Sequence, residues 1–448
     1  MNIRRHLMKI KWAKTIGTGM LVAAMVAVLS ACGQSKSTDN ASGQSGQAEK
    51  EPTVLSFMTT WSETDPFTGV YYKNAMAFQE ANPDIKLDIE TIPYNDYPVK
   101  LSTTAAAGKL PDLILMIDGS ATFQQIARSG ALMPIDDMMG HWKEDFLPSS
   151  KIQEYNVDGK QYGIPGEISY TTVIYYNKKI LRDAGYTEFP KTYEAFKAMV
   201  KDLKSKKITP ISYGNKVGTV VQASLLSPVN ERISGSGLYE EIKSGKQKFT
   251  DPEFMSALKE VKELSDLGAF NVDLNSIDNV QATNLFLSGN SAMYVDGSWG
   301  AKQISKDKSP DFELGFAMFP EFEGGKGSLS TTIGSTNQGV SLSAKLDDAK
   351  KAAAEKFLQF MYSKESYQNI MRDGNMVPAN VEAPADVNPL FKEMINEFAG
   401  VKEVIPPFNI VMPANVTTVA KNGLQGLTTP GGSAPEAVAE ELQKELGQ

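Results

Sequence analysis

The alternation of strand-like and helix-like segments between residues 53 and 130 constrains the fold more than any other feature of the chain. Strand-like segments are short and apolar or alternate between apolar and polar residues, whereas helix-like segments repeat apolar residues every three or four positions. In chain order, the two kinds of segment alternate over residues 53–60, 69–81, 85–92, 95–108, 113–117 and 121–129. Because this order is typical of strands joined by crossover helices, we predict an α/β fold whose sheets are open, mostly parallel and flanked by helices.

The rest of the chain is long enough to form a second lobe. About 400 residues follow residue 50, which is more than one hydrophobic core ordinarily serves, and 41% of the chain is hydrophobic, which is ample for burial. Further strand-like segments cover 171–176, 291–296 and 338–343, and helix-like segments cover 178–184, 192–205, 252–267, 279–287 and 347–362. Residues 324–334 are rich in Gly, Ser and Thr and are predicted to form a loop. We therefore expect two α/β lobes.

Residues 1–31 have the pattern of a signal peptide. They begin with basic residues and contain no acidic one, and the apolar run that follows is too short to span a bilayer. The run ends in Leu29-Ser-Ala-Cys32, which is similar to the lipobox of bacterial lipoproteins. We expect cleavage before Cys32, the single cysteine of the chain, and attachment of acyl chains such as palmitate through its thiol. The alternative is an ordinary secretory signal with an incidental cysteine.

Residues 32–51 separate the predicted anchor from the folded body. They are rich in Ser, Gly, Gln and Asn, and we expect a flexible tether with an r.m.s. reach of about 23 Å. The formal charge of −8 becomes more negative once the basic signal is removed, which argues against a nucleic-acid partner. These features predict a protein held by lipid on the extracytoplasmic face of a cell membrane of the Gram-positive type.

The common catalytic and cofactor-binding motifs are missing from the sequence. Two histidines, His6 and His141, are too few for a His-based metal cage, and no phosphate-binding loop, dinucleotide loop or nucleophile elbow is present. We therefore expect a protein that is not an enzyme and has no metal and no cofactor. Carboxylates are plentiful, so the acidic pair that a glycosidase needs stays an open alternative.

Aromatic and acidic residues lie where three of the predicted strands end. Trp61, Asp118 and Trp299 come at or shortly after these ends, and in open α/β sheets ligands bind beyond the carboxyl ends of the strands. An aromatic ring packs on the apolar face of a sugar, and a carboxylate accepts hydrogen bonds from its hydroxyls. The pattern predicts a carbohydrate-binding cleft, with Glu63 and Asp65 beside Trp61 as further candidates.

Each of these candidates also has a purely structural interpretation. Trp61 could cap the edge of the core, Asp118 could cap the helix that follows it, and Trp299 could pack between the lobes. Exposed acidic residues such as Glu63 and Asp65 are usually only solvated. The sequence leaves these alternatives open.

A set of short motifs in a fixed order makes the chain resemble a known family, the extracellular solute-binding proteins of ABC importers, specifically the type that carries oligosaccharides. Each motif is weak alone, but the ordered set covers nearly all of the chain that follows the predicted signal. The motifs are Ala107-Gly-Lys-Leu-Pro-Asp-Leu-Ile114, Gly130-Ala-Leu-Met-Pro-Ile135, Gly159-Lys-Gln-Tyr-Gly-Ile-Pro165 with Ile174-Tyr-Tyr-Asn-Lys178, Phe286-Leu-Ser-Gly-Asn-Ser-Ala-Met293 with Gly297-Ser-Trp299, and Ala354-Glu-Lys-Phe-Leu-Gln-Phe360.

The resemblance implies a periplasmic-binding-protein-like fold of two lobes joined by three crossings of the chain. Lobe one is expected to combine 52–165 with 297–342, and lobe two 168–295 with 344–448, with crossings near 164–172, 294–299 and 340–346. It also implies ligand contacts at Tyr170, in the first crossing, and at Asn337, shortly before the third. The loop 374–378 is expected near the cleft.

The resemblance implies a function of capture without chemistry. The protein would bind a carbohydrate, an oligosaccharide, between its lobes and deliver it to the permease subunits of an ABC transporter, acting as a monomer. The alternatives are a binding protein for another solute, such as a glycerol phosphate or a peptide, a lipid-anchored polysaccharide-degrading enzyme, and a structural or adhesive lipoprotein. A phosphate ligand would favour basic residues near the strand ends, and only Lys302 lies close to one in sequence.

Overall fold

The computed structural model describes residues 51–94, 96–117, 121–142 and 152–447. Within it, residues 50–448 form one compact unit. Cys32, the predicted signal and nearly all of the tether lie outside the described residues, and so does Asp118.

The first sheet has five strands in the order β2-β1-β3-β13-β4. Its strands are β1 (Thr53–Thr59), β2 (Ile85–Thr91), β3 (Leu113–Met116), β4 (Leu132–Met133) and β13 (Gly339–Ser343). The three strands from the N-terminal region are parallel, while β13 pairs antiparallel with both β3 and β4. Helices α1 (Gly69–Ala81) and α11 (Asp348–Met361) pack on each other and on this sheet, and α12 (Lys364–Arg372) packs against α1.

The second sheet has four strands in the order β11-β8-β10-β9. Its strands are β8 (Val173–Asn177), β9 (Thr209–Ser212), β10 (Ser291–Asp296) and β11 (Leu314–Ala317). Strand β8 runs antiparallel to its neighbours β11 and β10, and only β10 and β9 are parallel. The predicted α/β class is confirmed, but both sheets are mixed rather than mostly parallel, because strands from distant parts of the chain are added to them.

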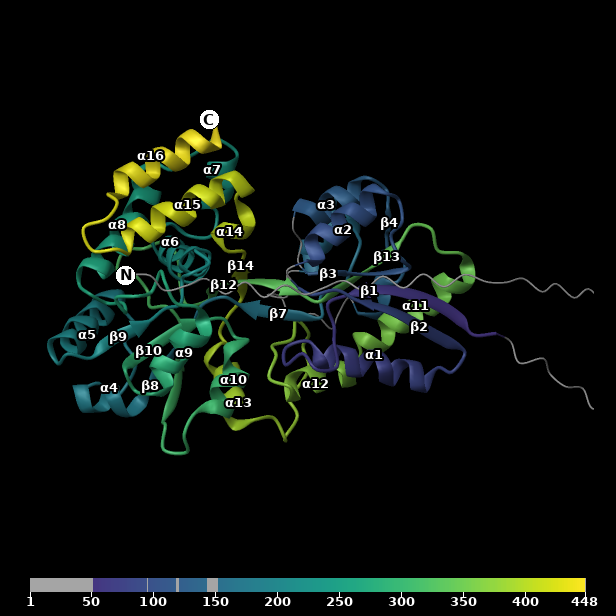
Figure 1. The fold of residues 1–448 in the computed structure, drawn as a ribbon, viewed down its shortest axis with the longest axis horizontal. Coiled ribbons are helices and arrows are strands. Elements are labelled where there is room, and N and C mark those ends of the chain that lie inside the picture. Colours follow the sequence, from purple (N-terminus) through teal and green to yellow (C-terminus); the bar gives the residue numbers. More distant parts are fainter. Residues whose placement is uncertain (1–50, 95, 118–120, 143–151, 448) are drawn as a thin grey trace, which may run out of the picture. The chain divides into compact units, whose positions relative to one another are not determined.

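A third sheet, of three strands in the order β14-β12-β7, runs between the other two (Figure 1). It contains β7 (Glu167–Tyr170), β12 (Thr331–Asn337) and β14 (Glu403–Ile405). Strand β7 leads directly into β8 of the second sheet, and β12 leads into β13 of the first. We call β7 and β12 the joining strands. A separate hairpin pairs β5 (Asn156–Val157) with β6 (Lys160–Gln161).

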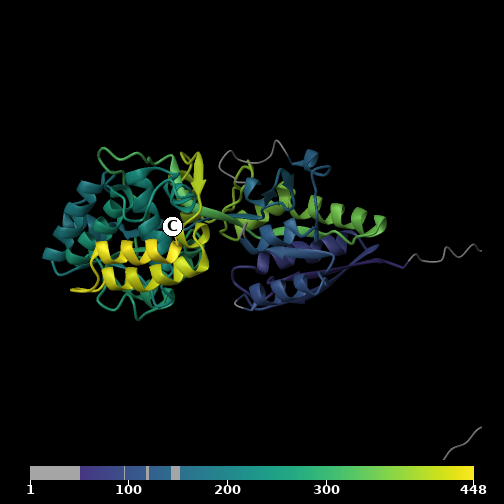
Figure 2. The ribbon, with the colours of Figure 1, turned by 90° about the horizontal axis from the view of Figure 1, so that it is seen from above.

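The remaining helices surround these sheets (Figures 1 and 2). Those on the N-terminal side of β7 are α2 (Tyr97–Ala106), α3 (Ala121–Arg128) and the 3-10 turns Met139–His141 and Ile152–Tyr155. Those after β8 are α4 (Lys178–Ala184), α5 (Tyr193–Ser205), a π-helical turn (Gln222–Leu226), α6 (Ser227–Ser234), α7 (Leu238–Lys243), α8 (Pro252–Asp266), α9 (Asn279–Leu287), α10 (Gly300–Asp307), α13 (Pro389–Glu397), α14 (Phe408–Val411), α15 (Ala414–Leu427) and α16 (Pro435–Leu446). Helices α8, α15 and α16 pack against one another.

Local signals explain why several helices have the predicted bounds. Asn177 caps α4 by accepting a hydrogen bond from the backbone N–H of Ile180, and α4 ends at Gly185 in the left-handed region, with φ of 104°. Asp278 and Gln281 form a reciprocal capping box at the start of α9. These contacts lie within a few residues of each other, so the sequence pattern is sufficient to predict them.

The predicted lobe boundaries need correction. We expected 297–342 in lobe one, but β11 pairs with β8 of the second sheet. We expected 344–448 in lobe two, but α11 packs on β1 and α1 of the first sheet. The chain therefore stays with the second sheet beyond 294–299 and returns along β12, and it leaves the first sheet again only after α12, not near 340–346. Periodicity reveals a strand or helix but not its distant partner.

The predicted loop at 324–334 is also wrong at its C-terminal end, because β12 begins at Thr331. Gly334, which suggested a loop, lies within β12 opposite Tyr170 of β7. A Cβ atom at Gly334 would collide with the Ser169 carbonyl oxygen, so the glycine permits a close approach of the two joining strands.

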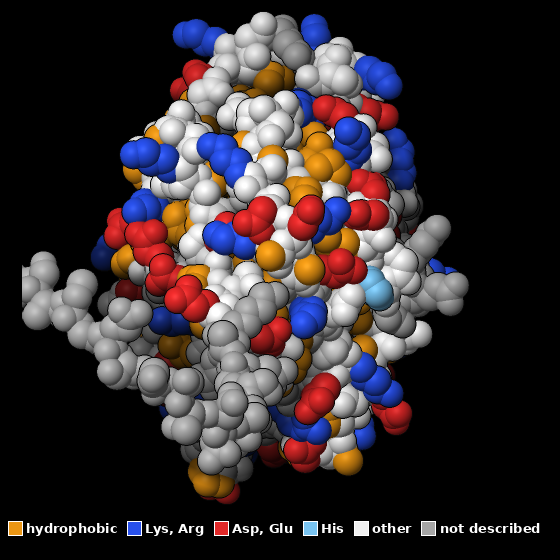
Figure 3. Space-filling model, turned by 90° about the vertical axis from the view of Figure 1, so that its right-hand side faces the viewer, with side chains coloured by type: hydrophobic (Ala, Val, Ile, Leu, Met, Phe, Trp, Pro, Cys, Tyr) orange, Lys and Arg blue, Asp and Glu red, His pale blue; other side chains and the backbone are white. Residues whose placement is uncertain are grey.

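The face of the molecule in Figure 3 carries Lys and Arg side chains interspersed with Asp and Glu. On that face no broad basic area gathers among the described side chains.

Candidate functional site

A cavity of about 960 Å³ lies among the ends of the two main sheets and the joining strands. The first sheet contributes the loops 60–68 and 91–94, which follow β1 and β2. The second sheet and its helices contribute residues from 219–224, 279–299 and 407–410, and Asn375 comes from the loop after α12. The cavity therefore lies beyond the carboxyl ends of β1, β2 and β10, as ligand sites in open α/β sheets generally do.

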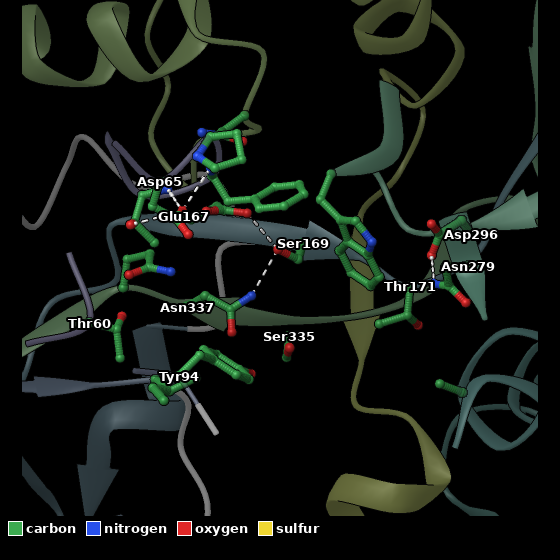
Figure 4. A pocket seen from close by; sticks show the side chains of 18 of the residues that line it. Thr60, Asp65, Tyr94, Glu167, Ser169, Thr171, Asn279, Asp296, Ser335 and Asn337 are labelled. Carbon is green, nitrogen blue, oxygen red and sulfur yellow. Dashed lines mark hydrogen bonds between the residues drawn. The ribbon is translucent and has the colours of Figure 1, made fainter. Parts of the chain in front are cut away.

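The joining strands present alternate side chains to the cavity (Figure 4). Glu167, Ser169 and Thr171 line it from β7 and the residue that follows it, and Ser335 and Asn337 line it from β12. Side chains two residues apart lie on the same face of a strand, which accounts for this spacing. The antiparallel register pairs Asn337 with Glu167 and Ser335 with Ser169, so the five polar side chains form one surface.

Hydrogen bonds link the side chains on this surface. Tyr71 Oη donates to Glu167 Oε2 at 2.7 Å, and Ser169 Oγ donates to Glu167 Oε1 at 2.6 Å. The Asn337 amide is hydrogen-bonded to Ser169 Oγ at 2.8 Å. Desolvation raises the pKa of the buried Glu167 carboxyl, while the hydrogen bonds from Ser169 and Tyr71 act in the opposite direction.

A second buried carboxylate, Asp296, lies at the end of β10. It accepts hydrogen bonds from Tyr294 Oη at 2.7 Å, from the backbone N–H of Gly297 at 2.8 Å and from Asn279 Nδ2 at 3.2 Å. Desolvation nevertheless raises the pKa of Asp296 to about 6. Trp299 follows three residues later, at the start of α10, and also lines the cavity.

Asp65 organises the loop that enters the cavity from β1. Its Oδ1 accepts hydrogen bonds from the backbone N–H groups of Phe67 and Thr68, at 2.9 and 2.7 Å, and from Thr68 Oγ1 at 3.0 Å. This turn carries Phe67, which is 47% exposed, and the loop after β2 carries Tyr94, which is 62% exposed; both line the cavity. Aromatic side chains therefore line the cavity both from the first sheet and, through Trp299, from the other side.

Four uncharged polar atoms of lining residues are buried without any hydrogen-bond partner within the described chain. They are Thr60 Oγ1, Thr171 Oγ1, Asn375 Nδ2 and Asn409 Oδ1. Because a buried unpaired polar atom is costly, such atoms are expected to find partners in a ligand or in water.

The predicted site residues divide into three groups. Asp65, Trp299 and Asn337 line the cavity, and Asp118 lies outside the described residues. The side chains of Trp61 and Tyr170 are buried instead, and Glu63 is exposed; none of these three lines the cavity.

Packing explains where the two buried aromatic residues lie. Trp61 is 1% exposed, stacks on Tyr71 with ring centroids 5.5 Å apart, and donates from Nε1 to Gln338 Oε1 at 2.7 Å. The alternative interpretation of Trp61 as a core-edge residue therefore describes it better. Tyr170 stacks on Phe398 with a centroid separation of 4.8 Å, and burial raises the pKa of its hydroxyl to about 12.

Four further residues line the cavity and were not predicted from the sequence: Phe67, Tyr94, Glu167 and Asp296. Asp296 could have been found, since it ends the strand 291–296 just as Asp118 follows the strand 113–117. In both cases the sequence pattern that indicates a site residue is a single carboxylate at the end of an apolar strand. Glu167 carried no such signal, because only its pairing with β12 places it at the cavity.

Basic side chains are missing from the lining as far as the described residues show it. Lys302, the base nearest to Trp299 in sequence, donates to the Pro66 carbonyl oxygen and to Asp373 Oδ2, both at 2.7 Å. Among the described residues no group of three or more His, Cys, Asp or Glu could hold a metal ion. The helices of this part of the chain include none long and apolar enough to cross a membrane.

The fold and the cavity define the class of protein as an α/β protein whose two lobes enclose a binding site. Residues 73–424 match the family model described as bacterial extracellular solute-binding protein, and the chain belongs to that family. Its members are binding proteins that act outside the cytoplasm.

Curated relatives and solved structures agree with this assignment. The chain is 26% identical over 362 residues to the multiple sugar-binding protein of Streptococcus mutans, covering 80% of each chain. It is 24% identical to the galactooligosaccharide-binding protein of Bacillus subtilis, over 98% of each. The solved structure of a chitin oligosaccharide binding protein superposes with a TM-score of 0.76 at 28% identity, covering 88% of this chain and 98% of that one.

Proposed function

We propose that this protein captures an oligosaccharide between its two lobes and delivers it to an ABC importer. The observation that carries the proposal is the lining of the cavity. Aromatic side chains enter it from both lobes, at Phe67, Tyr94 and Trp299, and uncharged polar groups lie between them. A sugar offers an apolar face to an aromatic ring and a rim of hydroxyls to polar groups, so this combination suits it. The sugar ligands named for the relatives support the same class.

The size of the cavity favours an oligosaccharide over a single sugar. Its volume of about 960 Å³ is at the upper end of the range for small-molecule sites. Phe67 and Tyr94 come from the loops after β1 and β2, whereas Trp299 follows β10 of the second sheet, so these aromatic side chains can contact different rings of one ligand. The sugar hydroxyls would form hydrogen bonds with Asp65, with Asn337 and with the four buried, unpaired polar atoms described above, which we call the orphan atoms. Tyr170, Glu63 and Trp61 lie outside this lining. Asp118 stays a proposed ligand contact that lies outside the described residues.

Binding is proposed to act by closing the lobes about the joining strands, without chemistry. A ligand shifts an equilibrium between open and closed forms only by its differential affinity for the two. Contacts from both lobes supply that difference. The permease subunits would then recognise the closed monomer.

Calorimetry against malto-, galacto-, xylo- and fructo-oligosaccharides tests the proposal. We expect at least one series to bind, with small-angle scattering showing compaction on addition of the same sugar. A folded protein that binds none of the four series would refute it. A protein that binds without compaction would refute the closing mechanism only.

The alternative ligands are a glycerol phosphate and a peptide, and the alternative activity is polysaccharide degradation. A phosphate would meet no basic side chain in the described part of the lining, and Lys302 is already bound to Pro66 and Asp373. An assay for reducing sugars released from a polysaccharide separates a receptor from an enzyme. We expect no release by the purified protein.

The lipid anchor on Cys32 completes the proposal. The anchor and the tether at 32–51 would keep the binding lobes within reach of the importer on the outer face of the membrane. One curated relative, from Streptococcus pneumoniae, is named as a solute-binding lipoprotein and is 24% identical over 98% of this chain.

A further inference from the structure

We propose that the cavity selects neutral glycans and rejects glycans that carry carboxylate or phosphate groups. The inference rests on the proposed function and specifies its substrate class. It depends on the charges that surround the ligand space, rather than on the aromatic side chains that indicate a sugar.

Three carboxylates border the cavity from three different elements. Asp65 comes from the loop after β1, Glu167 from β7 and Asp296 from β10. Figure 4 shows Asp65 and Glu167 on one side of the site and Asp296 beside Asn279 on the other. An anionic group on a ligand would therefore meet a carboxylate on either of these two sides of the site.

The hydrogen bonds of Asp65 leave one of its oxygens for a ligand. All three hydrogen bonds that Asp65 accepts from the chain are made to Oδ1. A sugar hydroxyl can donate to Oδ2 in a strong charge-assisted hydrogen bond. A carboxylate or phosphate on the ligand has no proton to donate there, so it would meet only repulsion.

No positive charge in the described lining offsets these carboxylates. Lys302 Nζ is committed to the Pro66 carbonyl and to Asp373. The orphan atoms of Thr60, Thr171, Asn375 and Asn409 are all uncharged. A neutral polyol can satisfy both the orphan atoms and the carboxylates, whereas an anion would be buried without a counter-charge.

The test compares matched glycans that differ only in charge. The neutral hexose glycan that binds best in the calorimetric panel is compared with its derivative in which primary hydroxyls are oxidised to carboxylates. For a xylan fragment, the glucuronic-acid-substituted form is compared with the same glycan after its carboxylate has been reduced to a primary hydroxyl. We expect the acidic member to bind at least about tenfold more weakly at pH 7.5.

Two variants attribute the effect to the cavity. Asp65→Asn keeps Oδ1 as the acceptor for the hydrogen bonds of the loop but removes the negative charge. It should therefore reduce the difference in affinity between the neutral and the acidic glycan. Asp88→Asn makes the same change of charge at an exposed position of β2, outside the lining, and should leave the difference unchanged.

The outcomes separate the inference from the proposed function. Equal or tighter binding of the acidic glycan overturns the inference and leaves the proposed function standing. The inference is also overturned if neither Asp65→Asn nor Asp296→Asn changes the difference in affinity between the neutral and the acidic glycan. Absence of binding to every glycan of the panel overturns the proposed function and, with it, the inference.

Discussion

Two tryptophans that each follow a strand have different roles because of their surroundings. Trp61 is buried against Tyr71 and Phe57, whereas Trp299 lines the cavity. Trp61→Ala should cost about 3–5 kcal/mol of unfolding free energy, as large core truncations do. Trp299→Ala should instead weaken glycan binding by about tenfold or more and affect stability less. Denaturant unfolding and calorimetry on both variants measure the two effects. Similar profiles for the two variants would contradict this assignment.

Asp296 is expected to lower the stability of the free protein at neutral pH. Its pKa rises from 3.8 to about 6 on folding, so the folded state holds the proton more tightly than the unfolded state. The resulting stabilisation is complete below about pH 4 and is lost as the pH rises through about 6, a change of about 3 kcal/mol.

Asp296→Asn removes this pH dependence. At pH 7.5 the variant should unfold at a higher temperature than the natural protein, and the gap should close as the pH falls toward 4. Its affinity for glycan should fall, because a charged acceptor is lost from the site. Thermal unfolding of both proteins between pH 4 and 7.5 measures how the difference in unfolding temperature changes with pH. If the difference in unfolding temperature increased as the pH falls toward 4, Asp296 would not be the titrating group.

At the scale of elements, the joining strands depend on a close approach of their backbones. Gly334 of β12 faces Tyr170 of β7, and a side chain there would meet the Ser169 carbonyl. Gly334→Val should therefore destabilise the protein by about 1–3 kcal/mol or more, as overpacking does. It should also weaken binding, since Ser169 and Asn337 lie on the same strands. Gly400→Val is a suitable control, because a Cβ at Gly400 meets nothing within 4 Å. Equal losses in both variants would contradict the proposed packing role.

Elements with local signals were predicted well from the sequence. The bounds predicted for α1, α4, α9 and β10 agree with the structure. The strand β12 was partly mistaken for a loop, because its partners β7 and β14 are more than sixty residues away in sequence. Capping and periodicity act over a few residues, whereas strand pairing across the chain leaves no comparable local pattern.

At the scale of the whole molecule, Cys32 decides where the protein is expected to act. Cys32→Ser removes the thiol that would carry the lipid, so the protein should move from the membrane fraction to the medium. Fractionation of cells followed by immunoblotting measures this change. Glycan affinity of the purified protein should stay the same, because the anchor lies outside residues 50–448, which form the binding unit. Retention in the membrane fraction would refute lipidation at Cys32.

The sequence by itself predicted the α/β class and the bounds of many elements, because these follow from periodicity and caps. The residue types at the strand ends led to the proposed class of ligand. Of the residues it singled out, Asp65, Trp299 and Asn337 line the cavity. Only the tertiary structure decided which lobe holds α11 and β11, that Trp61 belongs to the core, and that Glu167 and Asp296 face one cavity. The physical reason is that burial and charge at a site depend on contacts between segments hundreds of residues apart, which no local pattern specifies.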